Sequence, residues 1–65
     1  MEKAAKNKIK KRGVQIRDKI WVWHYSDKIK ITLFDEKIVV RVNNHDYGME
    51  HETGRHYMLM ALGRL

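Results

Sequence analysis

The sequence contains no cysteine and no long apolar run. Without cysteine, the chain can form neither disulfides nor zinc sites with cysteine ligands. No stretch approaches the roughly 18 apolar residues that a membrane-spanning helix needs, and no apolar segment of the signal-peptide type follows the basic N-terminus. We therefore expect a protein that does not enter membranes and that works in the cytoplasm, or in the host cytoplasm if it is viral.

The residues needed for common catalytic centres are also scarce. The chain has no glycine-rich phosphate loop, and a cysteine nucleophile is excluded. The two hydroxyl side chains near a histidine, Ser26 and Thr53, fall at a predicted turn and at a predicted helix cap. A chain of 65 residues also has little room to enclose a pocket of about 300 Å³ or more. We therefore expect neither an enzyme nor a bound cofactor.

Histidines and acids are concentrated between residues 45 and 56. The group consists of His45, Asp46, Glu50, His51, Glu52 and His56. Such residues could form a zinc or magnesium site. However, His51 and His56 are five residues apart, so they would not share one helix face as residues four apart do. We expect no metal here, but a polar connection and a first helical turn that face solvent.

The net charge of +6 is concentrated at the N-terminus. Residues 1–12 hold six bases and one acid, which gives +5, whereas the remaining 53 residues hold eight bases and seven acids. The six bases are Lys3, Lys6, Lys8, Lys10, Lys11 and Arg12. Basic N-terminal arms often bind nucleic acid, although such a tail can also serve solubility alone. Ala5 and Ile9 suit one helix face, but isolated helices of this length are marginal in water, so we expect a flexible or weakly helical arm.

A short motif, an acid followed by lysine and isoleucine, starts at residues 18, 27 and 36. This spacing matches a strand of about seven residues plus a two-residue turn. The predicted strands cover residues 19–25, 28–34 and 37–43, with turns at Ser26–Asp27 and Asp35–Glu36. Residues 14–16 either form a short fourth strand that turns back at Arg17–Asp18 or extend the first strand.

The predicted turns determine how the strands pair. The first hairpin would place Val22 opposite Ile31, and the second would place Ile31 opposite Val40. Alternation then brings the aliphatic side chains to one face of the sheet. They are Ile20, Val22, Ile29, Ile31, Leu33, Ile38, Val40 and Val42. β-Branched residues dominate this set, as is typical of a half-buried pleated surface.

Apolar residues near the C-terminus recur at helical spacing and predict a helix that covers this face. They are Tyr57, Met58, Ala61, Leu62 and Leu65. Thr53 is the predicted N-cap, although the helix could begin as early as Asp46. The expected fold is therefore α+β: a three- or four-stranded antiparallel β-meander with a C-terminal helix on one face. In this organisation residues 1–12 form a basic arm and residues 13–65 form one domain.

The opposite face of the predicted sheet combines aromatic and basic side chains. It carries Lys19, Trp21, Trp23, Tyr25, Lys30 and Arg41. Bases of single-stranded nucleic acid stack on aromatic rings, while cations follow the phosphates. Lys30 and Arg41 would lie side by side, and their repulsion would turn into attraction for an anion placed over them.

The sequence thus predicts a small nucleic-acid-binding protein for DNA or RNA, with single strands favoured. The predicted contacts are Lys6, Lys8, Lys10, Lys11 and Arg12 in the arm and Lys19, Trp21, Trp23, Tyr25, Lys30 and Arg41 on the sheet. With about six phosphate contacts, log affinity would fall against log salt with a slope near −5. The alternative is a protein-interaction module, or an inhibitor of the kind that viruses and mobile elements use, that docks through the tryptophan-bearing face. The same face could also form a homodimer. Alternatively, its apolar residues could form a second small core, covered by the N-terminal segment or by a returning strand at residues 14–16.

Overall fold

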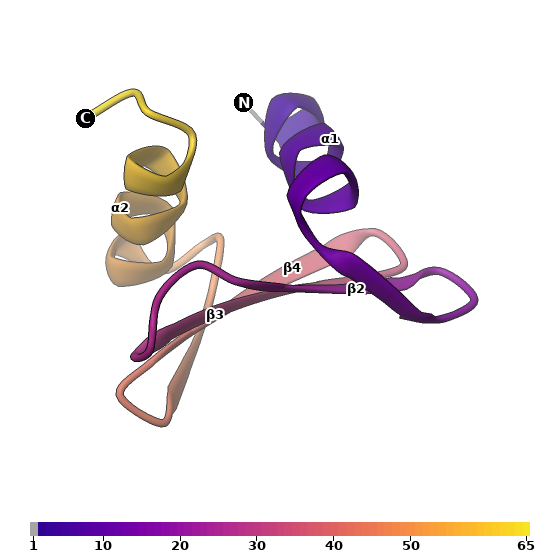
Figure 1. The fold of residues 1–65 in the computed structure, drawn as a ribbon. Helices are drawn as coiled ribbons and strands as arrows, with labels where there is room; N and C mark the ends of the chain where they lie inside the picture. Colours follow the sequence, from indigo (N-terminus) through magenta and orange to yellow (C-terminus); the bar gives the residue numbers. More distant parts are fainter. Residues whose placement is uncertain (1) are drawn as a thin grey trace.

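The computed structural model describes residues 2–65 as an α+β fold with five strands, one more than the largest predicted number. The elements are α1 (Glu2–Arg12), β1 (Val14–Arg17), β2 (Ile20–His24), β3 (Ile29–Phe34), β4 (Lys37–Val42), β5 (His45–Gly48) and α2 (Glu52–Ala61). The strands form one antiparallel sheet in sequence order, and both helices lie on the same side of it (Figure 1). The predicted class and the predicted C-terminal helix are therefore confirmed.

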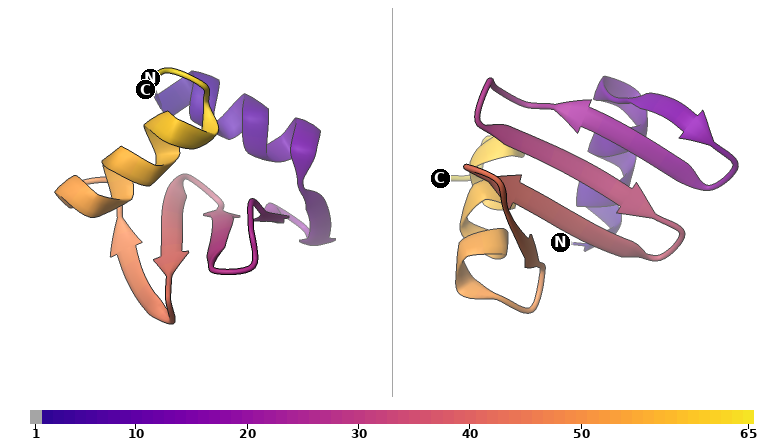
Figure 2. Two further views of the ribbon diagram at one scale, coloured as in Figure 1. Left: turned by 60° about the vertical axis from the view of Figure 1, so that its left-hand side comes forward. Right: turned by 90° about the horizontal axis from the view of Figure 1, so that it is seen from below.

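The molecule has two layers, a sheet and a pair of helices. Helix α1 packs on β2 and β3, and α2 packs on β4 and β5 (Figure 2). The side chains between the layers form one core: Ala5, Ile9, Ile29, Ile31, Leu33, Ile38, Val40, Met58 and Ala61. We call the helix-bearing side of the sheet the covered face and the other side the open face. Within residues 2–65 no helix is long and apolar enough to cross a bilayer.

The β3–β4 hairpin has the predicted register. Ile31 lies opposite Val40, and Leu33 lies opposite Ile38. Asp35 begins the turn between the strands with φ 51°, a left-handed conformation that Asp tolerates better than most residues. Clean alternation of aliphatic and polar residues along β3 leaves only one register that buries the aliphatic set.

The predicted register of the first hairpin is wrong by one residue. Ile31 lies opposite Trp23, and not opposite Val22. Ser26 and Ile29 exchange both backbone hydrogen bonds, so the turn falls one residue later than predicted. Because His24 pairs with Lys30, Tyr25 is left as an extra residue in its strand, which is a β-bulge. Every β2 side chain consequently lies on the face opposite to the predicted one.

The composition of β2 explains this error. Its segment Ile20–Trp23 is apolar at every position, so alternation alone cannot decide which side chains are buried. Burying two indole rings removes more apolar surface from water than burying Ile20 and Val22 would. Helix α1 covers these rings, whereas the leading prediction left the N-terminal segment as a flexible arm and kept its covering of the tryptophans only as an alternative. The packing of α1 therefore favours the observed register.

Residues 2–12 form an ordered helix of 11 residues, which corrects the expectation of a flexible arm. Ala5 and Ile9 share one helix face, and both are fully buried in the core. The sheet thus supplies the tertiary support that an isolated helix of this length lacks. Glu2 in the first turn and three bases in the last turn also suit the helix dipole.

Both edge strands were uncertain or missing in the prediction. Strand β1 is the predicted fourth strand, with a bulge between Gln15 and Arg17 and a turn in which Lys19 has φ 67°. Strand β5 was predicted as part of a polar connection. It follows a two-residue turn in which Asn43 and Asn44 both have positive φ, 50° and 69°. This is the backbone of the turn type that joins antiparallel strands most tightly, and asparagine adopts it readily.

Helix α2 begins two residues earlier than the predicted cap implies. Its N-cap is His51, whose Nδ1 accepts a hydrogen bond from the backbone N–H of Thr53 at 3.1 Å, so the prediction of Thr53 as the cap is wrong. Gly54 is buried where the helix crosses β5. A Cβ on Gly54 would collide with the Gly48 carbonyl oxygen and would lie 3.2 Å from that of Tyr47. The glycine therefore permits the close approach of α2 to the sheet.

Candidate nucleic-acid interface

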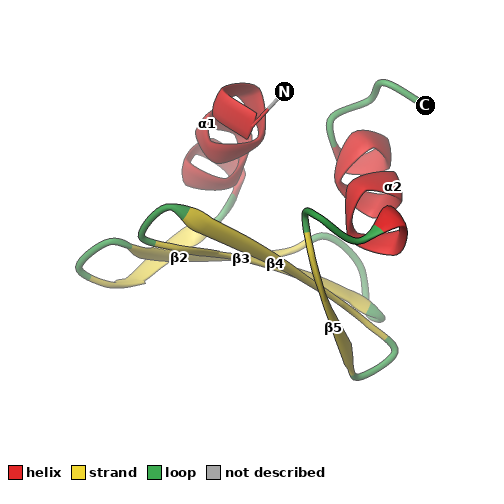
Figure 3. Ribbon diagram, turned by 180° about the vertical axis from the view of Figure 1, so that it is seen from behind, coloured by secondary structure: helices red, strands yellow, loops and turns green. Residues whose placement is uncertain are grey.

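The open face of the sheet carries no helix (Figure 3). Across β2 to β5, its outermost row consists of His24, Lys30, Arg41 and Asp46, each paired with the next. Lys30 and Arg41 are direct neighbours, as predicted. His24 occupies the position that was predicted for Trp23, because the first hairpin has the other register. The basic pair is therefore present on the open face without its tryptophan neighbour.

Trp21 and Trp23 lie on the covered face, which corrects their predicted position. Both are partly buried and pack against the core. The Trp23 ring meets Tyr25 edge to face, with ring centroids 5.5 Å apart. These three side chains therefore do not share a surface with Lys30 and Arg41, and the predicted combination of tryptophans and cations on one face does not exist.

The centre of the open face is apolar instead. One row runs across the sheet through Val14, Val22, Thr32 and Val39, and the next contains Arg17, Ile20, Phe34 and Lys37. Val14 is 69% exposed and Phe34 is 44% exposed, whereas Thr32 in the middle of the first row is buried. The face thus combines an apolar middle with basic side chains at both ends of the strands.

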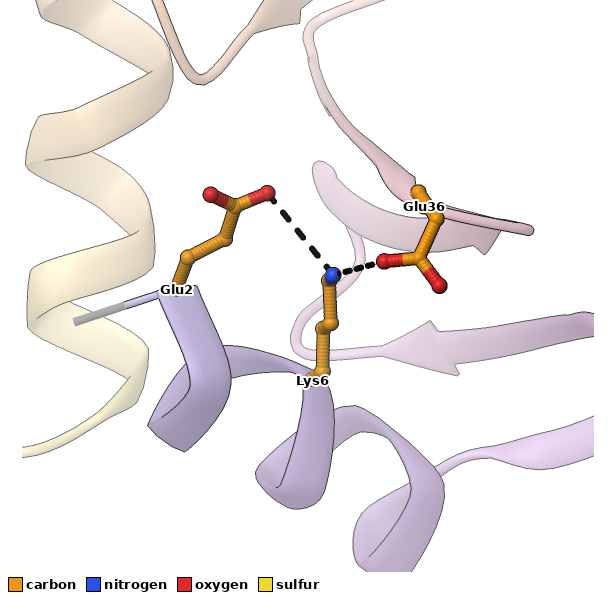
Figure 4. A network of polar contacts seen from close by, with 3 residues as sticks. All are labelled: Glu2, Lys6 and Glu36. Atoms are coloured by element: carbon orange, nitrogen blue, oxygen red, sulfur yellow. Dashed lines mark hydrogen bonds and ion pairs between the residues drawn. The ribbon is translucent and has the colours of Figure 1, made fainter.

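The lysines predicted for the arm are fixed on a rigid helix. Lys6 forms an ion pair with Glu36 and lies 3.9 Å from Glu2 (Figure 4). The Lys10 ammonium lies 4.9 Å from the centroid of the Trp21 ring, within the range of a cation–π interaction. The other four bases of α1 have no ion pair within residues 2–65. We call them the helix cations: Lys3, Lys8, Lys11 and Arg12.

The ion pair between Lys6 and Glu36 gives a prediction that titration can check. The hydrogen bond from Lys6 lowers the pKa of Glu36 below its usual range. We expect Lys6→Met to raise the pKa of Glu36 back toward that range, and Lys8→Met to leave it unchanged. An NMR titration that follows the Glu36 carboxyl carbon would measure both values. Equal Glu36 pKa values in the two variants would show that Lys6 does not pair with Glu36 in solution.

The sign of the pH effect follows from the same pKa. Because folding lowers the pKa of Glu36, the pair stabilises the folded protein fully above the unfolded pKa. This stabilisation is lost as pH falls through the folded pKa. Both groups are exposed to solvent, where such pairs contribute little, so the titration is a better test than the free energy of unfolding.

Arg41 and Asp46 form an ion pair between β4 and β5. Arg41 donates from Nε to Asp46 Oδ1 at 2.7 Å and from Nη2 to Oδ2 at 3.2 Å. These hydrogen bonds raise the pKa of Arg41 and lower that of Asp46. A two-point contact of this kind holds the guanidinium in one orientation. Arg41 is therefore a positioned cation on the open face, and Asp46 balances its single positive charge.

The remaining predicted sheet residue, Lys19, lies in the β1–β2 turn. The carbonyl oxygen of Lys19 accepts a hydrogen bond from the Asp35 N–H at 2.8 Å, and Lys19 is exposed to solvent. This turn is at the opposite end of the strands from Lys30 and Arg41, because Ile20 pairs with Phe34 while His24 pairs with Lys30. Lys19 is thus not brought together with the basic pair.

The histidine-rich segment has structural roles in this fold. His51 caps α2, and the Arg55 guanidinium donates to the Glu50 carbonyl oxygen at 2.9 Å. In the described part of the chain, no group of three histidine or acidic residues is placed to hold a metal ion.

Neither a protein family model, nor a curated protein, nor a solved structure matches this chain. Two surfaces of the described residues carry several basic side chains. They are the helix cations on α1 and the open face with its basic row.

Proposed function

We propose that this protein binds nucleic acid, and that α1 makes most of the phosphate contacts. The observation that carries the proposal is the presence of four unpaired cations on one ordered helix of 11 residues. A helix fixed to the core loses little further conformational freedom when a phosphate strand binds, whereas a flexible arm would lose much. The backbone that carries the helix cations is therefore ordered before binding.

The dipole of α1 accounts for only part of this charge. Bases in a last helical turn stabilise the helix, which explains Lys11 and Arg12 without a ligand. Lys3 lies in the first turn, where a cation opposes the dipole, and Lys8 lies in the middle. Nothing acidic within residues 2–65 pairs with either. A polyanionic partner would place a negative charge beside Lys3 and Lys8.

The corrected positions of the tryptophans change the expected binding mode. With Trp21 and Trp23 packed on the core, base stacking contributes less than predicted and phosphate contacts contribute more. Phe34 is the exposed aromatic ring on the open face, about 13 Å along β3 from Lys30. Single strands remain the favoured partner, because only unpaired bases can reach such a ring. The binding should be largely independent of sequence.

Salt dependence tests the proposal. Four helix cations on a single strand predict a slope of log affinity against log salt of about −3, shallower than the −5 expected for a fully engaged arm. We expect the triple variant Lys3→Gln, Lys8→Gln, Lys11→Gln to flatten this slope by about 2 and to weaken binding accordingly. Fluorescence anisotropy of a labelled oligo-dT strand at several salt concentrations measures both quantities.

A charge-matched control separates a local contact from net charge. The triple variant Lys19→Gln, Lys37→Gln, Arg64→Gln removes the same number of charges away from α1. It should keep most of the affinity and the slope. Equal losses in both triple variants would show that α1 is not the contact surface. No measurable binding of the unchanged protein to single or double strands at low salt would overturn the proposed function.

A protein-interaction module is the second candidate, and the apolar centre of the open face favours it. Val14, Ile16 and Phe34 are exposed apolar residues on or beside this face. The basic ends of the strands would select an acidic partner surface. In this case Phe34→Ala and Val14→Ala would abolish partner binding, while the helix cations could be neutralised without effect.

A further inference from the structure

A hollow lies at one end of the open face, where the β2–β3 loop meets the β4–β5 turn. Its volume is about 270 Å³. Pockets for drug-sized ligands range from about 300 to 1,000 Å³, and a water molecule occupies about 30 Å³ of the liquid. The hollow therefore has ample room for a small hydrated group such as a phosphate.

The charges around the hollow are mostly positive. Lys28, Lys30 and Arg41 line it, and Asp27 is the one acid among the described residues that do so. Lys28 and Lys30 have no ion pair within residues 2–65. Lys30 lies directly opposite Arg41 on the neighbouring strand, and the Arg41 charge is balanced by Asp46. An anion in the hollow would balance the charges of Lys28 and Lys30.

The ion pair with Asp46 holds Arg41 where it can donate a hydrogen bond to an anion in the hollow. Its Nε and Nη2 bind Asp46, which leaves Nη1 free of hydrogen bonds within residues 2–65. Because the ion pair fixes the guanidinium, Arg41 would lose little side-chain freedom on binding an anion.

Two asparagines supply uncharged donors at the same place. Asn43 and Asn44 line the hollow, and their side-chain amides make no hydrogen bond within residues 2–65. The N–H of Asn43 donates to the Lys28 carbonyl oxygen at 3.0 Å, which ties the turn to the loop across from it. A backbone hydrogen bond thus connects the β2–β3 loop and the β4–β5 turn, which form the two walls of the hollow.

We infer that this hollow binds a phosphate group through Lys28, Lys30, Arg41 and the amides of Asn43 and Asn44. The combination of ammonium, guanidinium and amide donors suits phosphate oxygens. His24, at the end of the same row, adds a further donor beside the site. If the proposed function holds, the bound group is a backbone phosphate, and the site is a second contact on the face opposite α1.

An NMR titration with inorganic phosphate tests the site directly. At constant ionic strength kept with chloride, we expect saturable shifts of the backbone amides of Lys28, Asn43 and Asn44. The double variant Lys28→Gln, Lys30→Gln should weaken phosphate affinity about tenfold or more, because it removes two charged donors. The control Lys37→Gln, on the open face at the other end of β3 and β4, should leave the affinity unchanged.

A gain of affinity gives a test that misfolding cannot imitate. Asp27→Asn removes the acid beside the site, and it should tighten phosphate binding about threefold. Shifts that rise linearly without saturation, or an equal loss in Lys37→Gln and the double variant, would overturn the site and indicate screening by ions only.

A second titration with oligo-dT identifies the source of the phosphate. If the oligonucleotide shifts the same amides and competes with inorganic phosphate, the ligand is a nucleic-acid backbone. If it does not, while phosphate still saturates, the site takes a free phosphate or a small phosphate ester.

The two proposals can also fail separately. If oligonucleotide binding depends on the helix cations, while these amides do not shift and phosphate does not saturate, the phosphate site is wrong and the proposed function stands. If phosphate saturates but no oligonucleotide binds, the site stands and the proposed function is wrong.

Discussion

Ile9→Ala should lower the free energy of unfolding by about 2–4 kcal/mol, although Ile9 belongs to a segment whose sequence resembles a flexible basic tail. The side chain is fully buried between α1 and the sheet. Its truncation leaves a cavity that the neighbouring side chains can fill only in part. Because a small domain has only a few kcal/mol of net stability, a loss of this size would unfold a substantial part of the protein.

Ile16→Ala is the matched control, since it makes the same chemical change in the adjoining segment. Ile16 is 58% exposed, so its truncation should change the free energy of unfolding by about 0.5 kcal/mol or less. Urea denaturation followed by tryptophan fluorescence measures both variants. If Ile9→Ala and Ile16→Ala unfold at the same urea concentration, α1 is not packed on the sheet.

Gly54→Ala should destabilise the protein by about 2 kcal/mol or more, even though alanine is the better helix former by about 1 kcal/mol. The added Cβ would collide with the Gly48 carbonyl oxygen and lie 3.0 Å from its carbonyl carbon. These atoms belong to backbone, which cannot move aside as a flexible side chain can. Either α2 shifts away from β5, or the end of β5 is displaced.

Asn7→Ala provides the comparison for Gly54→Ala. Asn7 is an exposed position of α1, so alanine there should raise stability by a few tenths of a kcal/mol through helix propensity alone. Thermal unfolding by circular dichroism measures the opposite signs of the two changes. A stabilising effect of Gly54→Ala would mean that α2 does not approach β5 closely.

The sequence predicts the fold correctly where the pattern of apolar and polar residues allows only one strand register. Along β3, Ile29, Ile31 and Leu33 alternate with Lys30 and Thr32, and in β4 only Val39 departs from the alternation of apolar and polar residues. Only one register of this hairpin buries the aliphatic residues. The same alternation correctly predicted Lys30 and Arg41 as neighbours on the face away from the core.

The errors occur where the local pattern allows two solutions. In β2 both faces are apolar, so the bulge at Tyr25 and the cover supplied by α1 decide the register. Neither is visible in the spacing of the acid-Lys-Ile motif. Strand β5 was missed because His45 and Asp46 are polar and the strand is at an edge. The adjacent asparagines, Asn43 and Asn44, were the available signal, since this pair suits a tight hairpin turn.

The predicted binding site depended on the register and changed with it. Lys30 and Arg41 were predicted from the alternation of β3 and β4, which is correct, and the lysines of α1 from charge alone, so all of them keep their place on the surface. The tryptophans were predicted from alternation, so one shift in pairing moved both to the core. His24, Asn43 and Asn44 were not predicted as site residues, because only the contact between two distant loops brings them together.

The bulge in β1 has a consequence for the behaviour of concentrated protein. Strand β1 is an exposed edge that contains Val14 and Ile16, and edges of this kind invite a second molecule to add its own strand. The irregular register between Gln15 and Arg17 interrupts the row of backbone donors and acceptors, and the charge of Arg17 repels an identical neighbour. This irregular edge therefore disfavours the addition of a second molecule's strand at β1.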